Sequence, residues 1–425
     1  MNEQSKKSNA LPILMMILLF GMVSFVTNLA APMGIVVKGQ FQASNFMGML
    51  GNFANFAAYA FMGIPAGLML KKIGYKKTAL VAIAVGFTGV LVQYLSGVAG
   101  SFGIYLTGAF ISGFSMCMLN TVVNPMLNTI GGGGKKGNQL VQIGGTFNSL
   151  MATLVPVLVG ILVGEVTKDT AITDVNPVLF IAMGIFAVVG IVLSFVHIPE
   201  PHVQITNHTI KYEHSPWSFR HFVLGTIAIF VYVGIEVGVP GTMNLFLVDP
   251  NGFAGSAAEA GLVTGTYWFL MLIGRFVGAS IGAKYSSKAM LTFASSLGIV
   301  LVLAAILLPT SILINMPVFK ADLSFGMAEV PVNAMLLVLV GLCTSIMWGG
   351  IFNLAVEGLG KYTEAATGIF MVMVCGGGIL PLIQGAVADA GGFITSFWVV
   401  FLGLAYLLYY ALIGSKNVNK DIPVE

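Results

Sequence analysis

The chain has 425 residues, of which 57% are hydrophobic and only 8% are charged. An ordinary soluble domain carries roughly 25% charged residues. Nineteen basic and 16 acidic residues cannot cover a soluble protein of this length, which excludes a soluble enzyme, a nucleic-acid-binding protein and a disordered chain. The net charge of +3 is too small to indicate a polyanionic partner. The sequence therefore predicts a protein embedded in a lipid bilayer.

Long apolar segments predict an all-α integral membrane protein with twelve transmembrane helices. A transmembrane helix needs about 20 apolar residues, whereas a transmembrane β-barrel shows alternating segments of roughly ten residues. Glycine, at 53 residues, favours close packing of such helices. The predicted spans are 11–37, 46–70, 78–97, 102–128, 139–164, 177–197, 220–247, 257–283, 289–309, 332–356, 364–388 and 393–414.

A polar stretch divides these spans into two groups of six. We predict an N-terminal six-helix bundle over 1–198, a cytoplasmic linker over 199–219, and a C-terminal six-helix bundle with a cytoplasmic tail over 220–425. A second polar stretch, Asn315–Val330, is predicted to be a loop on the outer side. Two similar halves with a site at their interface are typical of secondary transporters.

The distribution of basic residues predicts the orientation. With the N-terminus in the cytoplasm, fifteen of the 19 basic residues fall on the inner side, three fall outside, and Arg275 lies within a span. Cytoplasmic loops of membrane proteins carry an excess of Lys and Arg. We therefore expect both termini to be cytoplasmic.

Polar side chains within the spans indicate a binding cavity, because such residues need a partner or a water-filled space. Asn120, Asn124 and Asn128 recur every four residues and so share one helix face. Amides donate and accept hydrogen bonds as sugar hydroxyls do, and an indole suits the apolar face of a sugar ring. The alternative is that these amides only join helices. The predicted substrate-binding residues are Asn28, Asn55, Asn120, Asn124, Gln142, Asn148, Trp268, Trp348 and Asn353.

Charged residues suggest coupling and gating roles. Glu236 is the carboxylate that we place in mid-span, and Arg275 follows on the next span. A charge at this depth predicts a cation-coupling function, and a purely structural ion pair is the alternative. On the cytoplasmic side we expect a gate of loop lysines that pair with a carboxylate. The predicted gating residues are Lys71, Lys72, Lys76, Lys284 and Glu357.

No cofactor or metal is expected. The five histidines lie in or beside the linker at spacings that match no metal site, and the three cysteines are dispersed in apolar runs. The segment from Gly131 to Lys136 lacks the phosphate-loop pattern. Without a nucleophile–base or metal constellation, the sequence does not predict an enzyme.

Several motifs together resemble the major facilitator superfamily, and within it the fucose/hexose:proton symporter family. The resemblance extends from about residue 20 to 410. In the first half it rests on Gly63-Ile-Pro-Ala-Gly67 and Asn120-Thr-Val-Val-Asn124-Pro. In the second half it rests on Tyr232-Val-Gly-Ile-Glu236-Val, Gly274-Arg275-Phe, Ile351-Phe-Asn353-Leu-Ala and Gln384-Gly-Ala-Val-Ala-Asp389.

The resemblance implies the major facilitator fold, and import of a neutral glucose-, galactose- or mannose-like hexose across a bacterial inner membrane. It implies alternating access by a monomer, with a proton as the expected coupling ion. Two carboxylates of the L-fucose permease are absent here: Ala30 follows Asn28-Leu29, and Asn120 stands where that permease has Glu. Sodium coupling, facilitated diffusion, a drug exporter and a non-transporting sugar sensor remain open alternatives.

Overall fold

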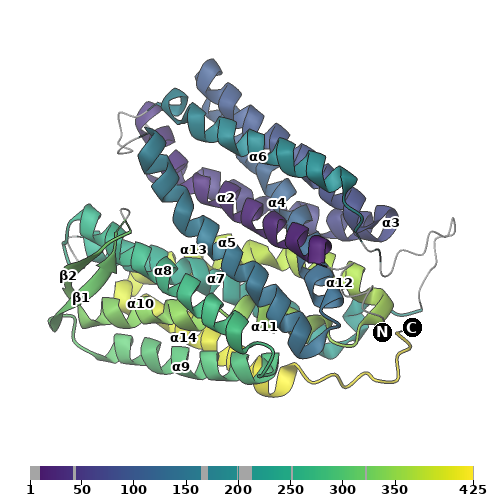
Figure 1. Cartoon of the computed structure of the whole chain (residues 1–425). Helices are drawn as coiled ribbons and strands as arrows, with labels where there is room; N and C mark the ends of the chain where they lie inside the picture. Colours follow the sequence, from purple (N-terminus) through teal and green to yellow (C-terminus); the bar gives the residue numbers. More distant parts are fainter. Residues whose placement is uncertain are drawn as a thin grey trace.

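The computed structural model describes residues 10–41, 45–163, 171–198, 200, 213–249, 252–320 and 323–424. Its helices form two groups that lie side by side, and helix α5 runs between them (Figure 1). The first group contains α2 to α6, and the second contains α7 to α14 together with a β-hairpin.

The first group consists of five helical elements that hold six spans. The element α3 contains two of the predicted spans, because the helix direction breaks at Gly74 with φ 82° and ψ 177°. Glycine takes positive φ at little cost since it has no Cβ. The elements are α2 (Ala10–Gln40), α3 (Asn45–Ala99), α4 (Phe102–Ile130), α5 (Gly134–Val163) and α6 (Asn176–Phe195).

The second group begins with three continuous helices and continues with interrupted ones. The continuous helices are α7 (Arg220–Val248), α8 (Ala257–Ile281) and α9 (Ser287–Leu307). The tenth span is divided into α10 (Val332–Thr344) and α11 (Met347–Val356), and the eleventh into α12 (Thr363–Val372) and α13 (Gly376–Gly391). The last helix, α14, covers Phe393–Tyr409. Irregular backbone at membrane depth is tolerated where it is buried in protein or lines a cavity.

These helices confirm the all-α membrane fold. Among the described residues, ten helices are long and apolar enough to cross a membrane. This count treats α3 as one helix and does not include the 30-residue α5. With the two arms of α3 counted separately and α5 added, the number agrees with twelve spans. Large apolar side chains such as Phe61, Phe195 and Phe293 are exposed on the outer surface, where a bilayer would cover them.

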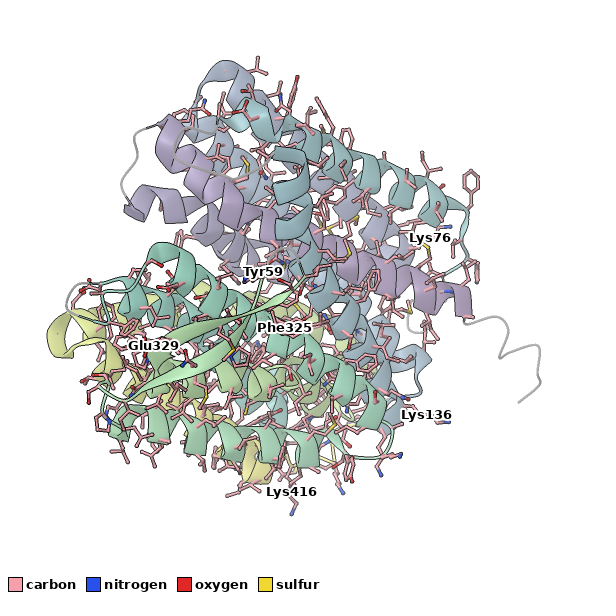
Figure 2. All side chains as sticks on the ribbon, turned by 60° about the vertical axis from the view of Figure 1, so that its left-hand side comes forward. Tyr59, Lys76, Lys136, Phe325, Glu329 and Lys416 are labelled. Carbon is pink, nitrogen blue, oxygen red and sulfur yellow. The ribbon has the colours of Figure 1, made fainter. Side chains whose placement is uncertain are left out.

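The predicted polar loop at Asn315–Val330 is instead a β-hairpin. Strands β1 (Leu313–Phe319) and β2 (Phe325–Pro331) pair antiparallel. Every second residue is buried in the middle of each strand, as a strand with one covered face requires. Figure 2 shows Glu329 on the side of the molecule away from Lys76 and Lys136, with Phe325 nearer the middle of the view. Asp322, predicted in the same loop, lies outside the described residues.

The most extensive contacts between the groups are those of α5 with α8 and of α3 with α12. At the second contact, glycines from both helices meet. A Cβ added at Gly368 would lie 2.7 Å from the carbonyl oxygen of Gly63 and 2.9 Å from Cα of Gly67. Such a close approach of two backbones requires small residues. Most of the predicted linker lies outside the described residues.

Candidate functional site

A cavity of about 180 Å³ lies between the two groups of helices. This volume is below the roughly 300–1,000 Å³ of pockets that hold drug-sized ligands, so it suits a smaller solute. Apolar side chains from both groups line it together with a set of polar ones. The polar lining residues are Ser24, Thr27, Asn28, Tyr59, Asn120, Gln142, Asn148, Ser149, Glu236, Trp268, Arg275, Ser345 and Trp348.

Six of the nine predicted substrate-binding residues line this cavity. They are Asn28, Asn120, Gln142, Asn148, Trp268 and Trp348. The two predicted coupling residues, Glu236 and Arg275, line it as well. The remaining three, Asn55, Asn124 and Asn353, are not part of its lining. Tyr59, which follows Asn55 by four residues on α3, does line the cavity.

The cavity-lining amides of α2 and α4 use their Nδ2 groups in hydrogen bonds within the protein. Asn28 Nδ2 donates to the carbonyl oxygen of Ser24 at 2.9 Å, and Asn120 Nδ2 donates to the Tyr59 hydroxyl at 2.9 Å. Neither amide oxygen accepts a bond from any residue that the structure describes. Two acceptors are therefore available to a bound solute from this side.

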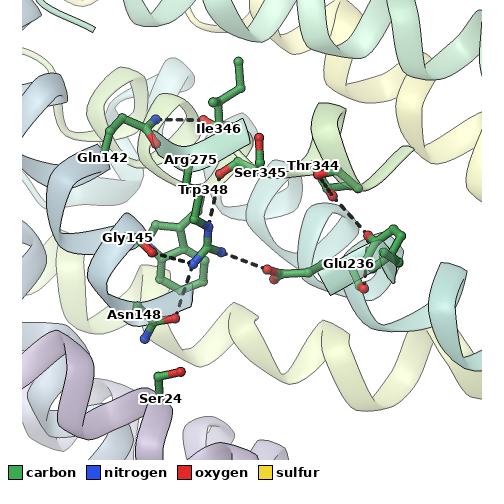
Figure 3. A network of polar contacts seen from close by, with 12 residues as sticks. Ser24, Gln142, Gly145, Asn148, Glu236, Arg275, Thr344, Ser345, Ile346 and Trp348 are labelled. Atoms are coloured by element: carbon green, nitrogen blue, oxygen red, sulfur yellow. Dashed lines mark hydrogen bonds and ion pairs between the residues drawn. The ribbon is translucent and has the colours of Figure 1, made fainter. Parts of the chain in front are cut away.

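Arg275 makes the largest set of polar contacts at the site (Figure 3). Its Nη2 lies 3.1 Å from Glu236 Oε1, and its Nε donates to the carbonyl oxygen of Ser345 at 3.2 Å. Nη1 donates across the interface to the carbonyl oxygen of Gly145 at 3.1 Å and to Asn148 Oδ1 at 3.2 Å. One guanidinium thus joins α7, α8, the break in span 10, and α5.

The charges of Glu236 and Arg275 compensate each other in a nearly dry environment. Their side chains are 14% and 10% exposed. A buried charge without a partner is strongly unfavourable, whereas a hydrogen-bonded pair is tolerated. The cavity therefore carries no net charge from this pair.

The break between α10 and α11 releases backbone carbonyls at cavity depth. The carbonyl oxygen of Ser345 accepts a hydrogen bond from Arg275, and the carbonyl oxygen of Ile346 accepts one from Gln142 Nε2 at 3.0 Å. Gln142 belongs to α5, so this bond also crosses between the two groups. The irregular backbone is satisfied by side chains, as a dry interior requires.

The amides outside the cavity make contacts between helices. Asn124 Oδ1 accepts from Trp348 Nε1 at 3.0 Å, and Asn353 Nδ2 donates to Asn138 Oδ1 at 2.9 Å. Both bonds join the first helix group to the second. Asn55 is 7% exposed, and its Oδ1 has no hydrogen-bond partner in the described part of the chain.

The predicted gating residues lie near the lysine-rich end of the molecule. Lys71, Lys72, Lys284 and Glu357 are exposed, and Lys76 Nζ donates to the carbonyl oxygen of Ser194 at 2.7 Å. The backbone carbonyl of Glu357 bonds His221 at 2.9 Å.

Two further residues, Glu364 and Lys135, make contacts at this end that the sequence did not indicate. Glu364, buried in the first turn of α12, is the carboxylate whose charge interacts with Lys71. Lys135 Nζ donates to the backbone carbonyl of Lys284 at 3.0 Å, which ties α5 to the end of α8. Glu364 is the first residue of the predicted span 364–388, and this position was the sequence signal available for it.

No group of three or more His, Cys, Asp and Glu residues that could hold a metal occurs within the described ranges. The polar groups at the cavity are instead amides, hydroxyls, indoles and one ion pair. This set can bind a small hydroxylated solute and can bind or release a proton at Glu236.

Comparisons with known proteins agree with this architecture. A family model described as Major Facilitator Superfamily matches residues 13–380. The glucose/galactose transporter of Brucella abortus biovar 1 (strain 9-941) is 30% identical over 419 residues, covering 97% of this chain and 96% of that protein. The L-fucose-proton symporter of Escherichia coli (strain K12) is 23% identical, covering 97% and 95%. The crystal structure of the transporter FucP in its outward conformation superimposes with a TM-score of 0.81 at 22% identity, covering 96% and 100%.

Proposed function

Since the chain belongs to the Major Facilitator Superfamily, we propose that it imports a neutral hexose together with a proton, by alternating access. The observation that carries the proposal is the cavity between the two halves, which combines free amide acceptors with a compensated ion pair. The relative from Brucella abortus is named for glucose and galactose, so these are the first candidate substrates.

The cavity chemistry favours a neutral polyhydroxylated solute. Asn28 and Asn120 offer acceptors to sugar hydroxyls, and Trp268 offers an aromatic surface to the ring. A charged solute would compete with the Glu236–Arg275 pair, and breaking a buried pair is costly. We therefore assign sugar binding to the six lining residues. We assign the contacts between the halves to Asn124 and Asn353. Asn55, whose backbone lies against Gly113 of α4, is assigned to helix packing within the first group.

Proton coupling is favoured over sodium coupling by the way the potential cation ligands are occupied. Sodium needs several oxygens, and the strongest ligands near the break in span 10 include the Glu236 carboxylate and the carbonyls of Ser345 and Ile346. One Glu236 oxygen and the Ser345 carbonyl already bond Arg275, while the Ile346 carbonyl bonds Gln142. A proton needs only one carboxylate oxygen, and Glu236 borders the cavity.

We place the lysine-rich end in the cytoplasm, following the positive-inside rule. The cross-interface hydrogen bonds of the described residues then run from cavity depth toward the cytoplasm, at Arg275, Gln142, Asn353 and Lys135. Such an arrangement is closed to the cytoplasm, so we assign it to an outward-facing state. Lys71 and Glu364 are proposed members of the cytoplasmic gate, beside Lys72, Lys76, Lys284 and Glu357.

Counterflow of labelled sugars into proteoliposomes tests substrate binding without requiring a coupling ion. The purified full chain is reconstituted and preloaded in turn with glucose, galactose, mannose, fucose and N-acetylglucosamine. We expect exchange of glucose or galactose, and we expect no exchange in liposomes without protein. Folded protein that exchanges none of the five sugars would overturn the hexose assignment.

Concentrative uptake then tests the coupling ion in the same vesicles. We expect an inward proton gradient to drive accumulation and an inward sodium gradient at constant pH to have no effect. In Glu236→Gln, accumulation should disappear while counterflow persists, because the amide keeps the shape and cannot release a proton. Accumulation driven by sodium, or a Glu236→Gln variant that still accumulates sugar, would overturn the proton assignment.

A further inference from the structure

Two polar residues outside the cavity, Asn244 on α7 and Thr264 on α8, have no part in the function proposed above. Asn244 Nδ2 donates to Thr264 Oγ1 at 3.1 Å, and this bond joins the two helices. Both residues are partly exposed. Polar residues within membrane spans face the interior of the bundle or a water-filled space, because exposure to lipid is costly. The position of this pair therefore indicates a wet surface inside the molecule.

Helical spacing places the pair on the cavity faces of its two helices. Asn244 follows Val233 by 11 residues, and Thr264 precedes Arg275 by the same number. Both helices are continuous over these stretches. Eleven residues are close to three whole helical turns, so residues at this spacing point in nearly the same direction. Val233 and Arg275 line the cavity, so Asn244 and Thr264 continue its two walls.

The pair lies on the outer side of the cavity in the orientation proposed above. Helix α8 runs toward Lys284 at the lysine-rich end, so Thr264 precedes the cavity along the chain. At a rise of 1.5 Å per residue, Thr264 lies about 6 Å beyond Trp268, and Asn244 lies about 10 Å beyond Val237. Trp268 and Val237 line the cavity, whereas neither member of the pair does. The pair is thus a separate polar position one to two turns further out.

The pair has hydrogen-bonding capacity of both kinds to spare. Asn244 Oδ1 accepts no hydrogen bond from any described residue, and the Thr264 hydroxyl donates to none of them. An amide oxygen is an acceptor, and a threonine hydroxyl that accepts one bond still has its own proton to donate. A sugar hydroxyl both donates and accepts, so the pair offers it a partner for each role.

Glycines keep the surroundings of the pair open. Gly241 on α7 and Gly261 and Gly265 on α8 lie within about one turn of it. A Cβ added at any of these three positions would meet no other described part of the chain within 4 Å. The cavity, at about 180 Å³, suits one small solute. The open region beyond Trp268 has room for a group that is linked to that solute.

We propose that Asn244 and Thr264 form an outer subsite for a second hydroxylated ring, linked to the hexose that occupies the cavity. The ligand class is a disaccharide that contains glucose or galactose. One ring lies in the cavity, and the other bonds Asn244 and Thr264. The second ring fills space between the halves that must close during transport, so the disaccharide binds from outside and is not carried across. The inference rests on the proposed function, because it requires a hexose in the cavity.

The test measures how external disaccharides inhibit uptake of labelled glucose or galactose. Right-side-out membrane vesicles, made from a strain that lacks its own hexose uptake and expresses the full chain, present only the outer face. Lactose, melibiose and maltose are the probes, since they join their rings through different linkages. We expect at least one of them to inhibit several-fold more strongly than the unlabelled hexose, and we expect no uptake of that disaccharide when it is labelled.

Three variants then locate the site of inhibition. In Asn244→Ala the inhibition constant of the disaccharide should rise by up to about tenfold, which corresponds to one hydrogen bond. Thr264→Val should act in the same direction, and the KM for the free hexose should stay in place in both. Thr242→Val is the matched control: Thr242 is 6% exposed and follows Val233 by two and a half turns, so it faces away from the cavity. This variant should change neither constant.

Several outcomes would overturn the outer subsite. One is that no disaccharide inhibits more strongly than the hexose, and another is an inhibition constant that stays the same in both Asn244→Ala and Thr264→Val. A hexose KM that rises by the same factor as the inhibition constant would place the pair in a single sugar site. Loss of all uptake in both variants, with Thr242→Val normal, would assign the pair to helix packing. If the wild-type protein takes up no hexose, the proposed function itself fails, which is a different result and removes the premise of the subsite.

Discussion

The two sides of the cavity differ in chemistry. The first helix group contributes neutral amides and hydroxyls, among them Asn28, Asn120 and Tyr59, whereas the second contributes Glu236, Arg275 and two indoles. An amide cannot change its charge near neutral pH, and a carboxylate can. The difference teaches that one cavity can keep its charged, titratable pair on one side while the other side offers only neutral hydrogen-bonding groups. Arg275 connects them through Gly145 and Asn148.

The largest effect is expected from Arg275→Ala, which removes the connection between the two sides. Breaking a buried ion pair costs about 3–5 kcal/mol because the remaining charge has no partner. We expect uptake to be lost and the thermal unfolding temperature to fall, measured by transport and by differential scanning fluorimetry. The Arg275→Ala/Glu236→Gln variant removes both charges and should recover much of the stability. Equal instability of the two variants would contradict the ion-pair explanation.

A smaller effect is expected on the neutral side from Asn120→Ala. Loss of one hydrogen bond is worth about 0.5–1.5 kcal/mol, so the KM for the sugar should rise by up to about tenfold. The pH midpoint of uptake should not move, since Asn120 does not titrate. Initial rates over a range of sugar concentrations and pH values check both points. A displaced midpoint would break the separation between the two sides.

Asn353→Ala tests whether Asn353 binds the sugar or only joins the two halves. The change leaves the buried Asn138 oxygen without its donor, which costs about 1–3 kcal/mol. We expect a lower unfolding temperature with a KM close to the wild-type value. The same unfolding and uptake assays measure both quantities. A raised KM at unchanged stability would instead place Asn353 in the sugar site, as the sequence suggested.

The smallest effect is expected from Lys284→Ala at the lysine-rich end of the molecule. The contact with Lys135 uses the backbone carbonyl of Lys284, which the substitution keeps. Surface changes of this kind usually alter stability by less than about 0.5 kcal/mol. Lys135→Ala removes the donor and is the matched variant with the greater expected loss of uptake. A larger loss in Lys284→Ala would show that the Lys284 side chain, and not only its backbone carbonyl, takes part in the proposed gate.

The sequence predicted the fold closely because lipid imposes a simple rule on span length and polarity. It also located the ion pair, since charges in mid-span are rare enough to identify directly. The separation of Asn120 from Asn124 could not be predicted, although both share one helix face. They lie one turn apart along α4, and only the opposing Trp348 decides that Asn124 faces an indole and Asn120 faces the cavity.

The β-hairpin shows a different limit. Its inward residues, Met316 and Val318 on β1 and Ala328 and Val330 on β2, alternate with exposed ones. That pattern was present in the sequence, but the surrounding polar residues resembled an ordinary loop. The pairing becomes clear only when the strand is seen against α8, where Thr266 accepts a bond from the Phe319 backbone.

The contact of Gly63 and Gly67 with Gly368 has a consequence for how the halves separate. The two backbones meet there with almost no side chain between them, so dispersion contributes most of the attraction. Dispersion weakens steeply with distance, and a gap of 0.5–1 Å already forfeits a quarter to a half of the well. This contact is therefore either formed or lost, and intermediate separations of the two helices are not stabilised. It gives closure at this interface a steep, switch-like response to small displacements, which a layer of long, flexible side chains would have smoothed.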